Sequence, residues 1–217
     1  KGDKSVALWA VGNLDDAGLM TVVRKSEDDE IQYNAIRQIR ADSFLVELTL
    51  DESLSRNCRE VAFACVLGRR TVEASCRSMY LKTEEFWLAD RVLAKLGDRV
   101  RAEKCVADRS LSWMKNEKIS LDDRARVYLA IPDGVDYSGL SDQRLLCMMI
   151  AMAKERNRVF AKVVREGSLT SGSEIVKLAD GGYTVAETVS MWAVDHLDDS
   201  NLLTVIKKAR NPRILFN

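Results

Sequence analysis

The chain has little of what most catalytic and metal sites require. Its 217 residues include one histidine, His196, which excludes sites that need two, such as the His-x-x-x-His zinc motif. It shows no Ser/His, Cys/His or lysine arrangement typical of nucleophilic catalysis, and no Gly-rich phosphate loop after a strand. We therefore predict no catalytic, cofactor-binding or metal-binding residue and expect a protein that is not an enzyme.

Cysteine is sparse and irregularly spaced. No two cysteines form a C-x-x-C pair, so neither a disulfide framework nor a zinc ribbon is indicated. Cys65 and Cys147 lie in the apolar runs AFACVL and LLCMMI, and we expect both to pack as small hydrophobic side chains. This usage is typical of a reducing compartment and predicts a cytoplasmic location. The five are Cys58, Cys65, Cys76, Cys105 and Cys147.

An excess of one charge and a long apolar run are missing as well. The 33 Lys and Arg residues balance 33 Asp and Glu residues, which removes the electrostatic argument for a nucleic-acid or anionic-membrane binder. The longest apolar run, Leu145 to Ala153, is less than half of the roughly 20 residues that a membrane-spanning helix needs. A content of 47% apolar and 30% charged residues is typical of a soluble globular protein. The first residue is Lys1 rather than Met, as in a fragment or a trimmed chain.

What the chain does have is an internal repeat. Residues 9–25 read WAVGNLDDAGLMTVVRK and residues 192–208 read WAVDHLDDSNLLTVIKK, with ten of seventeen positions identical at an offset of 183. Weaker copies follow the same plan of an apolar stretch, a polar turn and a second apolar stretch. They span residues 35–48, 62–76 and 89–106.

The turns of these copies recur at regular intervals. They fall at Leu14, Ile39, Leu67 and Leu96, which gives spacings of 25, 28 and 29 residues, and the offset of 183 fits about seven such units. The pattern blurs between residues 107 and 185. There, SWMKNEKIS resembles an insertion, while GSLTSGS and the DGG sequence at residues 180–182 resemble loops.

Period and composition predict helices within each unit. Apolar residues recur at helical spacing on both sides of the first turn, and only two prolines, Pro132 and Pro212, interrupt helix formation. An aspartate precedes several of the second apolar stretches, where it would cap the following helix; losing such a cap costs about 1 kcal/mol. These residues are Asp16, Asp42, Asp98 and Asp199.

Pairs of short helices must stack to bury their apolar faces, which predicts a right-handed solenoid whose second helices line one face. The unit A-I-x-x-I-x-x-D-x-x-L-x-x-L, beginning at Ala35, resembles the short bacterial HEAT-like, armadillo-like repeat. The resemblance implies an all-α, right-handed α-α superhelix of about seven to eight helix-turn-helix repeats. We expect one domain over residues 1–217, clearest at 5–106 and 185–217 and irregular at 107–184. The family implies a scaffold that holds proteins, peptides or, in some cases, nucleic acid along a concave surface.

Candidate partner-binding residues come from the expected second helices and from the tryptophans. Arg24, Arg77 and Lys207 each follow a turn marker by ten residues, so stacked units could align them to hold an acidic peptide or phosphate, although other units break the row. Ordinary solvated helix ends explain them equally. Trp87 and Trp113 do not recur in the repeat and would serve as partner anchors if exposed.

Other conspicuous residues have simpler explanations. Trp9 and Trp192 occupy equivalent repeat positions, which predicts core packing. His196 aligns with Asn13, which indicates a polar turn residue. The acidic run at residues 27–30 lacks the central Gly of a calcium loop, so we expect a solvated linker that caps the next helix.

The main functional hypothesis is a non-enzymatic scaffold for a protein or peptide. Two alternatives use the same fold. The first is a nucleic-acid binder similar to the HEAT-like DNA glycosylases, although their active-site motif and their excess of basic residues are missing here. The second is a repeat protein similar to tetrapyrrole lyases. A fourth hypothesis is that the chain is part of a longer array, since it closes on the apolar sequence ILFN. We expect a monomer or a weak dimer.

Overall fold

The computed structural model describes residues 4–131, 140, 142–152 and 197–208, and these form helices without a strand. The all-α class is therefore confirmed for this part of the chain. None of its helices combines the length and the apolar character that crossing a membrane requires. The helices are α1 (Lys4–Val11), α2 (Asp16–Lys25), α3 (Asp29–Gln38), α4 (Asp42–Leu50), α5 (Arg56–Leu67), α6 (Val72–Lys82), α7 (Phe86–Leu93), α8 (Asp98–Arg101), α9 (Lys104–Lys115), α10 (Leu121–Leu129), α11 (Gln143–Met152) and α15 (Asp199–Lys208).

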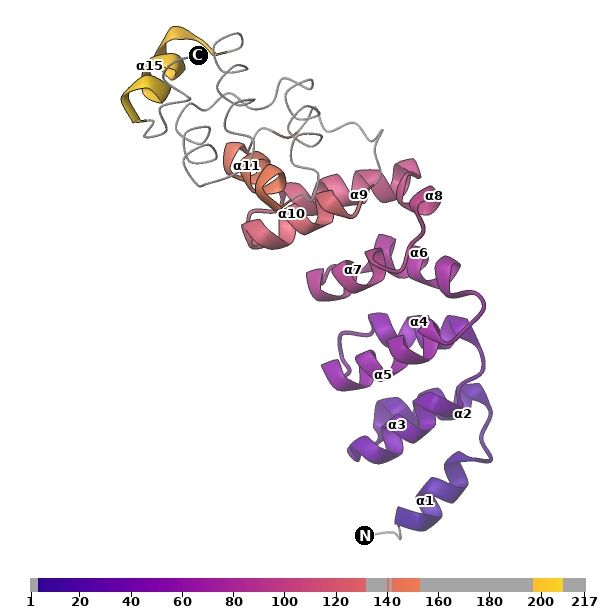
Figure 1. Ribbon diagram of the computed structural model, residues 1–217. Helices are drawn as coiled ribbons and strands as arrows, with labels where there is room; N and C mark the ends of the chain where they lie inside the picture. Colours follow the sequence, from indigo (N-terminus) through magenta and orange to yellow (C-terminus); the bar gives the residue numbers. More distant parts are fainter. Residues whose placement is uncertain (1–3, 132–139, 141, 153–196, 209–217) are drawn as a thin grey trace. The chain divides into compact units, whose positions relative to one another are not determined.

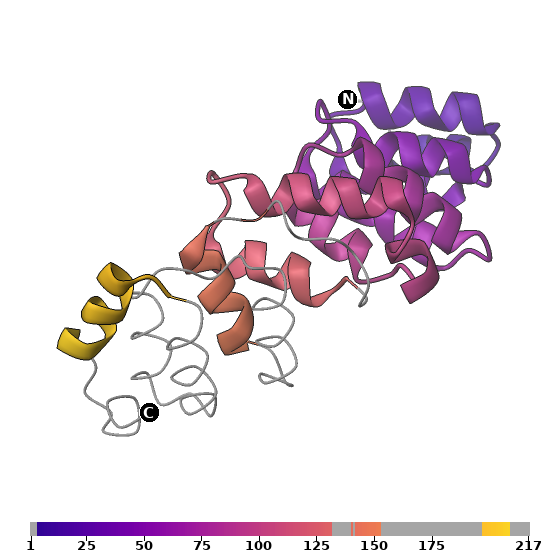
Figure 2. The same ribbon diagram turned by 90° about the horizontal axis from the view of Figure 1, so that it is seen from above.

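The chain divides into two compact units, Lys1–Val100 and Arg101–Asn217, and the single domain expected over residues 1–217 stays a prediction. Within the first unit, helices of odd number form one row, in which α1 packs on α3 and α3 on α5. Helices of even number lie beside them, α4 packing on α6 (Figure 1). The two rows meet through the pairs α2–α3, α4–α5 and α6–α7. Seen from above in Figure 2, the helices of this unit overlie one another, as a stack requires.

The predicted turns lie where the spacing places them. Leu14, Ile39, Leu67 and Leu96 mark the connections α1–α2, α3–α4, α5–α6 and α7–α8. Ile39 and Leu96 are buried, and so are apolar residues of every helix from α2 to α7. Each helix is too short to be stable alone, so burial between the rows supplies most of its stability.

The caps differ from the sequence prediction by one residue. Asp15, rather than Asp16, caps α2, because its Oδ1 accepts a hydrogen bond from Gly18 N at 2.8 Å. The residue before α4 is Ala41, which has no capping side chain, so Asp42 is the first helical residue and not the cap. In the acidic run, Asp28 caps α3 as expected, accepting from Glu30 N and Ile31 N.

The aspartates in the first turns of α2 and α4 instead contact the connection between the next two helices. Both Asp16 carboxylate oxygens accept from backbone N–H groups of Arg40 and Ala41, at 2.7–3.2 Å. Asp42 accepts from the Thr71 hydroxyl and lies 3.6 Å from Arg69 Nε. These bonds fix each helix pair against the following pair.

A third bond of this kind joins α6 to the α7–α8 turn. Glu73 accepts from Gly97 N at 3.1 Å. A Cβ at position 97 would lie 2.8 Å from the same carboxylate oxygen, so glycine permits the close approach.

In the second unit, α9 packs against α10 and α10 against α11. The segment SWMKNEKIS, which resembled an insertion, is the last turn of α9 followed by the turn into α10. Trp113 and Met114 are buried there, so this segment belongs to the core. The expected loops at GSLTSGS and residues 180–182 lie outside the described residues.

The two copies of the internal repeat have the same local structure. Helix α2 spans Asp16–Lys25 and α15 spans Asp199–Lys208, the same bounds at the offset of 183. Asp198 accepts from Asn201 N at 2.8 Å, as Asp15 does from Gly18 N. The threonines of both helices donate to the carbonyl four residues earlier, at 3.0 Å.

Candidate functional site

A surface groove of about 450 Å³ lies across the even-numbered helices of the first unit. Its lining combines the half-buried apolar residues Val46 and Leu50 of α4 with charged side chains. We call it the α2–α4–α6 groove, after the helices that supply its residues. They are Arg24, Ser43, Val46, Glu47, Leu50, Asp51 and Lys82.

Ion pairs hold one side of this groove. Arg24 Nη2 lies 2.6 Å from Glu47 Oε1 and its Nε lies 3.2 Å from Asp51 Oδ2. The hydrogen bond to Glu47 is the main reason why the pKa of Arg24 is raised. Burial raises the pKa of Asp51, but hydrogen bonds from Ser53 and from Arg24 outweigh it and lower the pKa overall. Arg24 therefore has a fixed position between two carboxylates.

Lys82 forms the other side of the groove. Its side chain is exposed, and it makes no ion pair with the part of the chain that the structure describes. A ligand carboxylate could approach this ammonium group without displacing an acid of the protein, unlike at Arg24.

The predicted row of cations is not continuous. Arg24 lies beside the acids of α4, Arg77 lies half-buried on α6, and Lys207 is exposed on α15 in the second unit. The groove brings Arg24 together with Lys82 instead.

Trp87 is half-buried and lies under three arginines of its own unit. The guanidinium carbons of Arg56, Arg59 and Arg91 lie 4.7, 5.4 and 6.0 Å from its ring centroid. Arg56 and Arg91 are also held by one oxygen of Glu60, at 3.2 and 3.3 Å. These contacts give Trp87 a role in joining α5 to α7 through cation–π interactions.

The other tryptophans differ from expectation. Trp113, a candidate anchor, is 4% exposed and stacks with Arg109 at 4.7 Å, so it presents no surface to a partner. Trp9, expected in the core, is exposed, because α1 has helix α3 on only one side. Trp192 and His196 lie outside the described residues.

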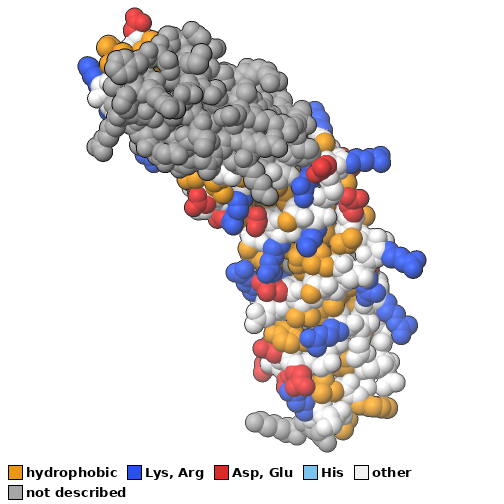
Figure 3. All heavy atoms as spheres, in the orientation of Figure 1, with side chains coloured by type: hydrophobic (Ala, Val, Ile, Leu, Met, Phe, Trp, Pro, Cys, Tyr) orange, Lys and Arg blue, Asp and Glu red, His pale blue; other side chains and the backbone are white. Residues whose placement is uncertain are grey.

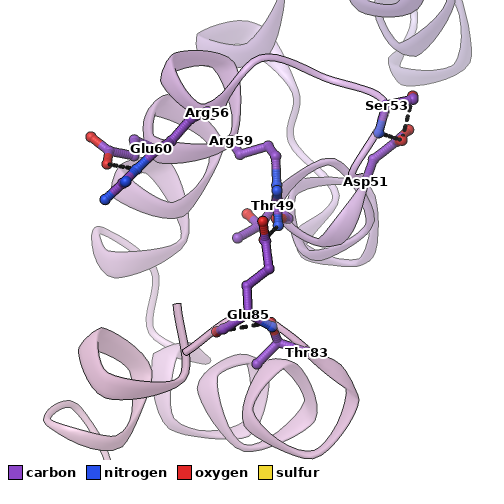
Figure 4. Close-up of polar contacts among 8 residues, drawn as sticks. All are labelled: Thr49, Asp51, Ser53, Arg56, Arg59, Glu60, Thr83 and Glu85. Carbon is purple, nitrogen blue, oxygen red and sulfur yellow. Dashed lines mark hydrogen bonds and ion pairs between the residues drawn. The ribbon is translucent and has the colours of Figure 1, made fainter. Parts of the chain in front are cut away.

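A buried arginine that the sequence analysis missed connects three helices. Arg59 of α5 donates from Nε to the carbonyl of Thr49, at the end of α4, at 2.9 Å. Its Nη2 pairs with Glu85, which precedes α7 (Figure 4). The hydrogen bond from Arg59 is the main reason why the pKa of Glu85 lies below its usual value.

Arg124 repeats this arrangement in the second unit. It donates from Nε to the Met114 carbonyl at 2.5 Å and lies 2.9 Å from Asp142. Burial raises the pKa of Asp142, but the N–H of Leu145 and the Arg124 guanidinium lower it overall. Gln32 of α3 has an equivalent place, donating to carbonyls at the end of α2.

A short pattern could have revealed these residues. In each case the side chain lies four positions after a helix-capping residue, as in Asp28 and Gln32, Ser55 and Arg59, and Ser120 and Arg124. The last two read S-x-x-x-R. The pattern escapes notice because it consists of two positions and arginine is common in this chain.

No group of described residues has the composition of a metal site. The cysteines of the described part are free thiols. Cys58 and Cys76 are buried, Cys65 is half-buried, and Cys105 is exposed. Burial raises the pKa of Cys76 to about 11 and also raises that of Cys65, so both stay protonated at neutral pH. The side chain of Cys147 lies outside what is described.

Charges of both signs are interspersed over the face shown in Figure 3, with apolar patches between them. A second hollow, of about 480 Å³, is lined only by residues of α9 and by Asn116, which follows it. It therefore lies along one helix, whereas three helices line the first groove. We therefore take the α2–α4–α6 groove as the candidate functional site.

Comparisons of the chain with models of protein families, with curated proteins and with solved structures found no match.

Proposed function

We propose that this chain is a non-enzymatic interaction scaffold, a solenoid of HEAT-like helical repeats that binds a peptide segment in the α2–α4–α6 groove. The observation that carries the proposal is the groove itself, to which three successive even-numbered helices contribute. In a stacked array, equivalent helices continue such a surface from one repeat to the next.

The chemistry of the groove indicates the kind of segment that fits. Val46 and Leu50 offer an apolar surface for an aliphatic side chain, and Lys82 offers an ammonium group to a carboxylate. Arg24 is already paired with Glu47 and Asp51, so it shapes the groove more than it attracts a ligand. The preferred ligand is an extended segment with an aliphatic residue followed or preceded by an acid.

Selection from a library of displayed peptides on the immobilised chain tests this function. We expect enriched sequences to pair an aliphatic residue with an acid and to bind at micromolar affinity. The exposed substitution Lys82→Glu should weaken binding at least about tenfold, because it replaces an attraction with a repulsion. Lys95→Glu, on an exposed lysine outside the groove, is the matched control and should leave binding unchanged.

The outcome that contradicts the proposal is equally concrete. If no peptide is enriched, or if the enriched peptides bind the Lys82→Glu variant as tightly as the unmodified chain, the groove is not a peptide site. Circular dichroism should give both variants the helical signal of the unmodified chain, which excludes unfolding as the cause of weaker binding.

A further inference from the structure

The most exposed large apolar side chains of the described residues lie on two helices. On α1, Trp9 and Val6 are 72% and 60% exposed; on α15, Ile206 and Leu203 are 59% and 51% exposed. Exposed apolar residues scattered singly are ordinary, but two pairs, each on one short helix, mark surfaces that other apolar groups cover in an assembly.

The internal repeat shows what covers the face of α15. Leu203 and Ile206 correspond to Met20 and Val23 of α2, at the offset of 183. In α2 these two residues are buried, and the helix packs against α3. Helix α15 buries Val205 instead and leaves the α2-like face open. The repeat therefore indicates that a helix of the α3 type fits this face.

Helix α1 has an exposed apolar face of the complementary kind. It lies in the same row as α3 and packs on it. Helix α3 is covered by α2, whereas Val6 and Trp9 of α1 have no such cover among the described residues. Among the described residues, therefore, no α2-like helix covers Val6 and Trp9 of α1, and no α3-like helix covers Leu203 and Ile206 of α15.

We propose that these two faces bind each other between copies of this chain, with α15 of one copy packing on α1 of the next as α2 packs on α3. The two faces differ, so the contact is head-to-tail and leaves a free α1 face and a free α15 face after each addition. Such a heterologous contact produces an open series of oligomers and not a closed dimer. One helix from each side makes a small interface, which predicts weak, concentration-dependent association.

Analytical ultracentrifugation of the 217-residue chain between about 5 µM and about 500 µM tests the proposal, because micromolar contacts form within that range. The average mass should rise steadily above 24.4 kDa with concentration. Trp9→Glu and Ile206→Glu should each abolish association, since each places a charge in the apolar contact. An equimolar mixture of the two variants should form a heterodimer and stop there, because one intact face of each kind remains.

Leu129→Glu is the matched control, a charge on a 39% exposed leucine of α10, a helix that contributes to neither face. It should associate as the unmodified chain does. Should either glutamate reduce the helical signal, Trp9→Ser and Ile206→Ser make the same test without a charge.

Three results would overturn the proposal. The first is a constant mass of 24.4 kDa over the whole range. The second is association that persists in either single variant, which would indicate that like faces pair. The third is a mixture that stays monomeric. None of these measurements involves the α2–α4–α6 groove, so peptide binding and self-association succeed or fail separately.

Discussion

Replacing Arg59 by methionine should destabilise the first unit more than any other single arginine change in it. Methionine keeps much of the length and packing but removes every charged donor. The Thr49 carbonyl, in a fully buried residue, would lose its bond from Nε, and an unsatisfied buried acceptor costs about 1–3 kcal/mol. Glu85 would lose its main cationic partner.

The magnitude follows from the exposure of the two partners. Removing one member of a fully buried ion pair costs about 3–5 kcal/mol. The Arg59 side chain is 5% exposed, but that of Glu85 is 33% exposed, so water partly replaces the lost cation. We therefore expect a loss of about 3 kcal/mol in the free energy of unfolding for Arg59→Met, the lower end of that range.

Urea titration followed by circular dichroism measures this loss, and two further variants make it specific. Arg56→Met removes the mostly exposed partner of Glu60, a pair that contributes about 0.5 kcal/mol or less. It also removes the guanidinium 4.7 Å from the Trp87 ring, a contact that contributes about 0.5–1 kcal/mol, so the total stays well below the loss expected for Arg59→Met. Glu85→Gln combined with Arg59→Met should cost less than the sum of the single changes, with a coupling of about 1–2 kcal/mol. A loss below about 1 kcal/mol for Arg59→Met would refute the assignment of Arg59 as a buried link between helices.

Three more outcomes are expected. The arginine partner lowers the pKa of Glu85, so this carboxylate stabilises the fold above its unfolded pKa, near 4.5, and the contribution is lost as the pH falls through the lower folded pKa. In Glu85→Gln, the free energy of unfolding in urea should therefore fall less steeply between about pH 5 and about pH 3. Native-state thiol labelling read by mass spectrometry should modify exposed Cys105 well before buried Cys58, and equal rates would contradict the burial. Asp15→Ala should cost about 1 kcal/mol through loss of the α2 cap, and chemical denaturation that shows no change would exclude it as the cap.

The sequence was most informative where structure depends on neighbouring residues. Apolar spacing predicted α1 to α6. The turn markers Leu14, Ile39 and Leu96 fall between paired helices, and Leu67 is the last residue of α5. These features involve residues within one or two helical turns, so the pattern contains the information. The prediction of an insertion failed at SWMKNEKIS, because its first four residues end α9 and only the others form the turn into α10.

The candidate site was less predictable. Arg24 was identified and does line the groove, but Lys82, Val46 and Leu50 were not identified. A groove depends on which side chains of three stacked helices converge, and their register differs because the turns vary in length. Trp113 illustrates the same difficulty, since tryptophan is suited both to a partner surface and to the core.

The sequence by itself determined that the described chain is helical, where its helix pairs turn, and that α2 and α15 are copies. Only the tertiary structure decided which aspartate caps a helix and which binds the next turn, as at Asp15 and Asp16. It also decided that Met20 is buried while its counterpart Leu203 is exposed. The physical reason is range: helix formation depends on residues a few positions away, whereas the bonds from Asp16 to residues 40 and 41 and the burial of Met20 depend on how separate helices pack.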